Sequence, residues 1–135
     1  MIKGIRCIML VDDNEHDNFF HEREIKKVDA SIDVVSKKSG NEALEYLKLN
    51  QEKENLHPDL IFLDINMHGM NGWEFLEHYN LLTRDVQSHA IIVMLTTSSN
   101  PADNKRAQSF NFISDYITKP LTQEILINIS TKHFK

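Results

Sequence analysis

Three aspartates that follow two apolar segments could together form a metal-dependent phosphoryl-transfer site. Asp12 and Asp13 come directly after residues 8–11, and Asp64 comes directly after residues 60–63. Two carboxylates about 4 Å apart repel by roughly 4 kcal/mol at an effective dielectric constant near 20, so such a cluster needs a proton, water or a cation. Mg2+ suits it, because this ion prefers oxygen ligands and keeps waters that a phosphoryl oxygen can replace. With Mg2+ bound, Asp64 could act as a nucleophile and accept phosphate as an aspartyl phosphate.

Two more polar residues follow apolar segments and could contact the oxygens of a transferred phosphoryl group. The Thr96 hydroxyl, after residues 91–95, could donate a hydrogen bond, and Lys119, just after residues 116–117, could supply a mobile positive charge. Taken singly, an aspartate in such a place is more often a helix cap, a threonine is usually structural, and a Lys-Pro pair is usually a turn. Their shared placement at the ends of four segments favours a joint role in chemistry.

The apolar segments predict a parallel sheet that would bring these ends together. Residues 60–63 contain no polar break, which is typical of a strand buried on both faces. Strands that alternate with helices predict an α/β fold with right-handed crossovers, and the ligand crevice of such a sheet lies at the carboxyl ends of its strands. The expected strands are 6–11, 32–36, 60–63, 90–95 and 115–117, and the expected helices are 16–28, 41–49, 73–82, 101–110 and a last helix after residues 119–122. The charged residues 50–57 are expected to extend a helix and then form a solvated loop.

Length and composition indicate one domain, residues 1–135, that buries roughly two-thirds of its unfolded surface. The net charge of -5 comes without a basic run, which argues against direct binding of nucleic acid. The single cysteine, Cys7, cannot form an internal disulfide and is expected to be a buried thiol in a reducing compartment. The apolar run at the N-terminus is too short for a signal peptide or a membrane span, so a cytoplasmic location is predicted.

From Cys7 to about Lys132, the sequence resembles the receiver domains of two-component response regulators. The matching residues are the acidic pair Asp12-Asp13, the phosphoacceptor Asp64, the switch hydroxyl Thr96, the switch aromatic Tyr116 and the lysine before a cis-bonded proline, Lys119-Pro120. The resemblance implies a doubly wound, flavodoxin-like (βα)5 three-layer sandwich with five parallel strands in the order 2-1-3-4-5. It also implies that Mg2+ is held by Asp13, Asp64, the backbone carbonyl of Asn66 and, through water, Asp12.

The resemblance implies a signalling switch that catalyses its own phosphorylation and dephosphorylation, and not a metabolic enzyme. The phosphoryl group would come from a histidine of a sensor kinase or a phosphotransfer protein. Thr96 would then move toward the phosphoryl group, Tyr116 would turn inward, and the fourth helix, fifth strand and fifth helix would change their affinity for a downstream protein. We expect no output domain after the fifth helix, and we therefore expect the signal to pass to a partner protein.

One position departs from the family pattern. Receivers commonly have Met-Pro after the phosphoacceptor strand, and this chain has Met67-His68. Without the proline the loop beside Asn66 has more conformational freedom, which bears on the lifetime of the phosphoryl group. A loop histidine is more often solvated than catalytic, so His68 is expected to act as a base only if it reaches the hydrolytic water. The other histidines are expected at the surface: His16, His21, His57, His78, His89 and His133.

Two other functions compete with phosphorelay signalling. An aspartate-nucleophile phosphatase or phosphotransferase of the haloacid dehalogenase type would need an acid/base aspartate two residues after Asp64, where this chain has Asn66. Such enzymes are also usually longer, with a cap over the substrate. A receiver-shaped interaction module that works without phosphorylation would leave the intact acidic and switch positions unexplained.

Overall fold

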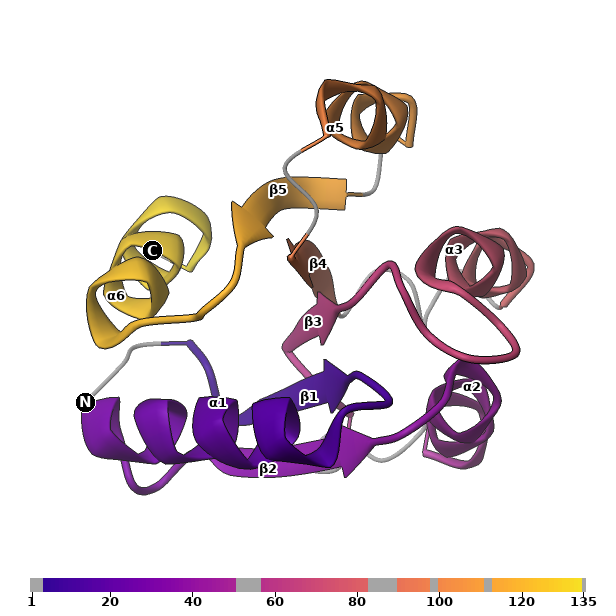
Figure 1. Ribbon diagram of the computed structural model, residues 1–135. Helices are drawn as coiled ribbons and strands as arrows, with labels where there is room; N and C mark the ends of the chain where they lie inside the picture. Colours follow the sequence, from indigo (N-terminus) through magenta and orange to yellow (C-terminus); the bar gives the residue numbers. More distant parts are fainter. Residues whose placement is uncertain (1–3, 51–56, 83–89, 98–99, 111–112, 135) are drawn as a thin grey trace.

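The fold is a five-stranded parallel sheet with helices on both faces (Figure 1). The computed structural model describes residues 4–50, 57–82, 90–97, 100–110 and 113–134. The strands are β1 (Cys7–Val11), β2 (Asp33–Lys37), β3 (Leu60–Leu63), β4 (Ile91–Thr96) and β5 (Ile113–Thr118), and the helices are α1 (Glu15–Val28), α2 (Gly40–Leu49), α3 (Gly72–Asn80), α5 (Pro101–Gln108) and α6 (Gln123–His133). The strand order β2-β1-β3-β4-β5 confirms the predicted doubly wound topology.

Two hydrophobic cores lie on opposite faces of the sheet, one under α2, α3 and α5 and the other under α1 and α6 (Figure 1). The central strand β3 contributes to both, because alternate residues of a strand point to opposite faces. Ile61 and Leu63 belong to the first core, and Leu60 and Phe62 belong to the second. All four side chains are buried, as the unbroken apolar run predicts.

Several element boundaries differ from the sequence-based expectation. β5 begins at Ile113 and not at residue 115, because its pairing with β4 starts there, with a register shift in β4 after Ile92. α3 ends at Asn80, two residues before the expected limit of 82, and α5 ends at Gln108 rather than at 110. The helix extension and loop predicted for the charged residues 50–57 fall mostly on residues 51–56, which lie outside the described residues. The strand ends that carry the polar residues are nevertheless placed as expected.

Two of the histidines were wrongly expected at the surface. His21 and His57 are only 3% and 4% exposed; His21 lies on the same face of α1 as the buried Asn18 and Ile25, and the His57 ring Nδ1 contacts the Pro58 carbonyl. His89 lies outside the described residues, and His16 and His78 are exposed as expected. Cys7 is a buried free thiol, and burial, followed by the charges of Asp59 and Asp33, raises its pKa to about 11.

In the part of the chain that the structure describes, no helix has both the length and the apolar character needed to cross a membrane.

Candidate functional site at the carboxyl ends of the strands

Backbone hydrogen bonds continue past the strand ends and hold the polar residues in place. The Asp64 N–H donates to the Val11 carbonyl at 3.0 Å, which joins the ends of β3 and β1. The Lys119 N–H donates to the Thr96 carbonyl at 2.8 Å, which joins the ends of β5 and β4. Asp12 is tied to the end of β2 in the same way. The sheet therefore fixes the main-chain positions of four site residues independently of their side-chain contacts: Asp12, Asp64, Thr96 and Lys119.

The three aspartates meet, as their places in the sequence predict. Asp12, Asp13 and Asp64 each offer a carboxylate oxygen, and these oxygens all lie within 4.8 Å of one another. Asp12 and Asp64 are buried, at 5% and 6% exposure, whereas Asp13 is partly open to solvent. Such a cluster of hard oxygen donors has the chemistry that Mg2+ prefers.

Lys119 lies among these carboxylates and balances part of their charge. Its Nζ is 2.6 Å from Asp12 Oδ2, 2.7 Å from Asp17 Oδ2 and 3.5 Å from Asp64 Oδ2. Burial alone would lower the pKa of Lys119, but the hydrogen bonds to Asp12 and Asp17 and the charge of Asp64 raise it overall. The ammonium group is therefore charged at neutral pH and is available to an anionic group on Asp64.

Asp17 is a member of the site that the sequence analysis missed. It occupies the first turn of α1, where an acidic residue ordinarily favours the helix dipole and needs no further explanation. Its place three residues after the N-cap Asn14 gave no signal beyond that ordinary role. The contact with Lys119 spans 102 residues and could not be read from this local pattern.

Asp64 carries the chemical features expected of an acceptor carboxylate. Burial and then the charge of Asp12 raise its pKa, whereas Lys119, the Thr96 hydroxyl and the Asn66 backbone N–H lower it. Its Oδ1 is buried and lacks a hydrogen-bond partner among the described residues. A buried, unpaired carboxylate oxygen is costly to leave without a ligand. The residues therefore fit a divalent cation or a phosphoryl group at this place.

Asp12 is oriented by the start of α1. Its Oδ1 accepts a hydrogen bond from the Asn14 N–H at 2.9 Å, and its backbone carbonyl accepts one from Asn18 Nδ2 at 2.8 Å. The Asn14 side chain in turn caps α1 by accepting from the N–H groups of His16 and Asp17. The cap thus sets the position of Asp17 as well as that of Asp12.

The loop between β3 and α3 closes the other side of the site. Both the backbone N–H of His68 and its ring Nδ1 contact Asp13 Oδ2, at 2.8 and 2.6 Å. Although the ring is open to solvent, as expected of a loop histidine, it is also bound to the acidic cluster. The pKa of Asp13 is lowered, chiefly by the hydrogen bond from the His68 backbone N–H; burial opposes this effect, and the hydrogen bond and charge of the His68 ring add to it.

Gly72 packs the start of α3 directly against the backbone of Asp64. Its N–H donates to the Ile65 carbonyl at 2.8 Å, and a Cβ atom at this residue would lie 2.5 Å from the Asp64 carbonyl oxygen. Gly69, in contrast, is needed for its conformation, with φ at 73° and open space around it. Gly69 in the loop and Gly72 at the start of α3 therefore serve different purposes.

The predicted switch residues lie on the neighbouring strands β4 and β5, with Thr96 the last residue of β4 and Tyr116 within β5, paired in register with Met94. Thr96 is fully buried and is paired in register with Thr118. Tyr116 is half-buried, and its side chain packs against the core under α2, α3 and α5. The peptide bond between Lys119 and Pro120 is cis. Asn66, whose carbonyl is the fourth expected metal ligand, is exposed in the loop after β3.

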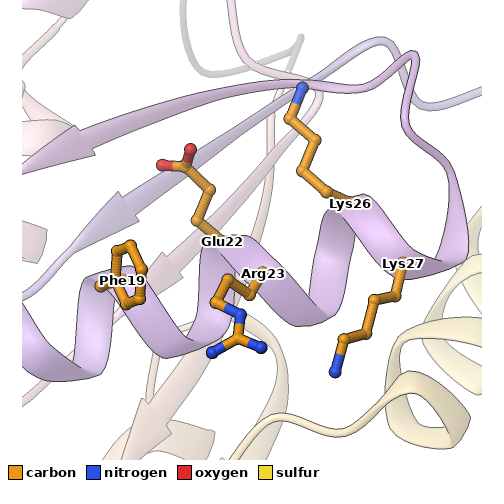
Figure 2. Close-up of a pocket in the computed structure, with 5 residues that line it drawn as sticks. All are labelled: Phe19, Glu22, Arg23, Lys26 and Lys27. Carbon is orange, nitrogen blue, oxygen red and sulfur yellow. The ribbon is translucent and has the colours of Figure 1, made fainter.

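A separate pocket lies on α1 (Figure 2). It is lined by Phe19, Glu22, Arg23, Lys26 and Lys27. Phe19 is 67% exposed, and the Arg23 guanidinium lies 5.9 Å from the centre of its ring. None of the three clustered aspartates is among the residues that line this pocket.

Comparison with known families matches residues 8–130 to the response regulator receiver domain. The chain belongs to this family. A probable methanogenesis regulatory protein, FilR2 of Methanothrix harundinacea, is 31% identical to this receiver over 88% of the chain and 75% of FilR2. Protein PilH of Pseudomonas aeruginosa is 28% identical over 89% of the chain and 90% of PilH.

A solved structure extends this similarity to three dimensions. The crystal structure of a two-component response regulator from Cytophaga hutchinsonii superposes on this receiver with a TM-score of 0.87 and 30% identity, covering 95% of the receiver and 96% of that chain. The flavodoxin-like order of strands is thus shared with an experimentally determined relative.

Proposed function

We propose that this receiver accepts a phosphoryl group on Asp64 from a histidine of a sensor kinase or a phosphotransfer protein. The observation that carries the proposal is the buried Asp64 carboxylate, with one unpaired oxygen and with Lys119 Nζ 3.5 Å from the other. The single cysteine favours a reducing compartment, so we place this reaction in the cytoplasm.

Mg2+ would be held by Asp13, Asp64 and the backbone carbonyl of Asn66, with Asp12 acting through water. When bound, the ion supplies positive charge that offsets the repulsion between the acceptor carboxylate and the phosphoryl oxygens. The donor set of the acidic cluster supports this choice, since Mg2+ prefers carboxylate and carbonyl oxygens.

The chain's own residues perform the transfer. A carboxylate oxygen of Asp64 attacks phosphorus, the phosphorus–nitrogen bond to the donor histidine breaks, and the imidazole leaves with the bonding electron pair and takes a proton from solvent. Lys119 exchanges a carboxylate contact for a phosphoryl oxygen and stabilises its charge. The Thr96 hydroxyl donates to a second phosphoryl oxygen at the end of β4. The sheet edge thereby positions all three groups before the donor arrives.

Phosphorylation then alters a surface made of α5, β5 and α6. Movement of Thr96 toward the phosphoryl group allows Tyr116 to turn inward, and this changes the affinity of the surface for a downstream protein. Support comes from a pocket between α5 and β5 that Tyr116 lines together with Asn104, Ala107 and Gln108. The aromatic ring is therefore placed where its rotation would reshape an accessible surface.

Intact-mass analysis of the full chain after incubation with acetyl phosphate tests the proposal. One phosphoryl adduct per chain is expected with Mg2+, and none after the ion is chelated, because Asp64 cannot accept the anion unaided. Steady turnover of p-nitrophenyl phosphate would instead indicate a small-molecule phosphatase. A folded, Mg2+-binding chain that forms no adduct with acetyl phosphate or beryllofluoride would indicate an interaction module that works without phosphorylation.

The contact between Lys119 and Asp17 leads to a prediction about the rate of transfer. Asp17→Asn weakens one of the two short contacts of Lys119, so the lysine reaches the phosphoryl group more readily. We expect the rate of adduct formation to rise several-fold. Because Asp17 is partly exposed, the free energy of unfolding should fall by less than about 1 kcal/mol.

Stopped-flow mixing with acetyl phosphate measures this rate, and urea unfolding measures stability. Glu24→Gln serves as the control, since Glu24 is also on α1 and pairs with Lys27 rather than with Lys119. A slower reaction in Asp17→Asn would show that Asp17 orients Lys119 for transfer and does not hold it back.

A further inference from the structure

We propose that His68 is a positioning residue for Asp13 and that it sets the Mg2+ affinity of the site. Two hydrogen bonds from this one residue fix the Asp13 carboxylate in the orientation in which it meets the cation. The inference rests on the proposed function, because it takes Asp13 to be a cation ligand.

Both hydrogen bonds end on the same carboxylate oxygen. The His68 backbone N–H lies 2.8 Å from Asp13 Oδ2, and the ring Nδ1 lies 2.6 Å from it. A carboxylate can only accept, so Nδ1 carries the hydrogen in this contact. A proline at position 68 would offer neither donor, because it lacks both the N–H and a polar ring. The backbone bond therefore needs a residue other than proline at this position, and the ring bond needs the histidine.

Asp13 depends on His68 in a way that the other two aspartates do not. Asp12 is held by the Asn14 N–H and by Lys119, and Asp64 also lies within ion-pair distance of Lys119. Across the residues that the structure describes, Asp13 makes no ion pair with Lys119, and the hydrogen bonds that its carboxylate accepts from other residues come from His68. Its negative charge is thus left for a cation, while its orientation is set by the loop after β3.

The exposure of the ring separates its effect on the site from any effect on the fold. The His68 side chain is 102% exposed, so its removal leaves no cavity and costs the hydrophobic core nothing. Carboxylates that bind metals are themselves oriented by hydrogen bonds, and loss of such an outer partner typically weakens metal binding by about 10- to 100-fold. A truncation at this position should therefore change metal affinity without changing stability.

Isothermal titration calorimetry with Mg2+ on the full chain tests the inference. His68→Ala keeps the backbone N–H and loses the ring, so we expect about tenfold weaker binding, the lower end of the range for such partners. His68→Asn places an amide nitrogen where Nδ1 lies and should bind Mg2+ nearly as tightly as the wild type. His78→Ala removes an exposed histidine of α3 and controls for loss of an imidazole elsewhere. Thermal unfolding without Mg2+ should be the same in all variants.

The outcomes separate this inference from the proposed function. Unchanged or tighter Mg2+ binding in His68→Ala would overturn the role of His68, even if the wild type binds Mg2+ and is phosphorylated. Binding as weak in His68→Asn as in His68→Ala would overturn the hydrogen-bond explanation. If the wild type neither binds Mg2+ nor forms an adduct, the proposed function itself fails.

Discussion

Asp64→Asn is expected to abolish the phosphoryl adduct and, at the same time, to stabilise the fold at neutral pH. The amide cannot act as the nucleophile, so no acyl phosphate forms. The second effect follows from the raised pKa of Asp64, caused by burial and then by Asp12. An acid whose pKa is raised on folding favours the folded state at low pH, and this contribution is lost as the pH rises through the pKa of the folded state.

Asparagine keeps the shape of the side chain and removes a charge that opposes folding above that pKa. Urea unfolding at pH 7 and at pH 4 measures the difference, which should be larger at pH 7. Asp115→Asn, on β5 and away from the acidic cluster, is the control and should keep the adduct. An adduct that persists in Asp64→Asn would mean that another residue accepts the phosphoryl group.

Gly72→Ala is expected to cost about 3 kcal/mol of stability, the upper end for an overpacked position. The new Cβ would lie 2.5 Å from the Asp64 carbonyl oxygen and 2.8 Å from Ile65 Cα. These neighbours are backbone atoms of the segment that carries the acceptor, so no side chain can rotate away to relieve the contact. Either α3 moves outward or the end of β3 moves, and the second response also slows phosphorylation.

Gly69→Ala is the matched control, three residues earlier in the same loop. No atom lies within 4 Å of the added Cβ, so only the left-handed conformation at φ 73° is penalised, by about 1 kcal/mol. Urea unfolding of the two variants compares the costs, and intact mass reports on the acceptor. Equal destabilisation by both substitutions would contradict the close-packing explanation for Gly72.

The fold and the core of the site could be predicted because they depend on local patterns. Unbroken apolar runs such as residues 60–63 identify the strands, and a parallel sheet brings the carboxyl ends of neighbouring strands to one edge. The meeting of Asp12, Asp13 and Asp64 follows from these two facts. The strand order itself came from the likeness to receivers and not from periodicity.

The remaining features depend on side-chain contacts between segments that lie far apart in the sequence. Asp17 looks like an ordinary acidic residue at a helix start, and its partner Lys119 is 102 residues away. His68 looks like a solvated loop residue, and Asp13 lies 55 residues before it. His21 is buried although α1 carries its exposed aromatic residues, Phe19 and Phe20, at the two preceding positions. His21 shares a helix face with the buried Asn18 and Ile25, but the apolar residues at positions 19 and 20 obscure this spacing in the sequence.

The sequence separation between Lys119 and its ion-pair partners bears on how the chain folds during biosynthesis. Lys119 contacts residues that precede it by 102 and 107 positions, so these contacts form only after nearly the whole described chain has left the ribosome. Until then the early carboxylates lack their internal cation, and contacts between such distant residues form late because of the entropy of loop closure. Under the proposed function, a nascent chain that ends before Lys119 lacks the lysine expected to stabilise the phosphoryl group on Asp64, so competence for phosphorylation is gained only late in synthesis.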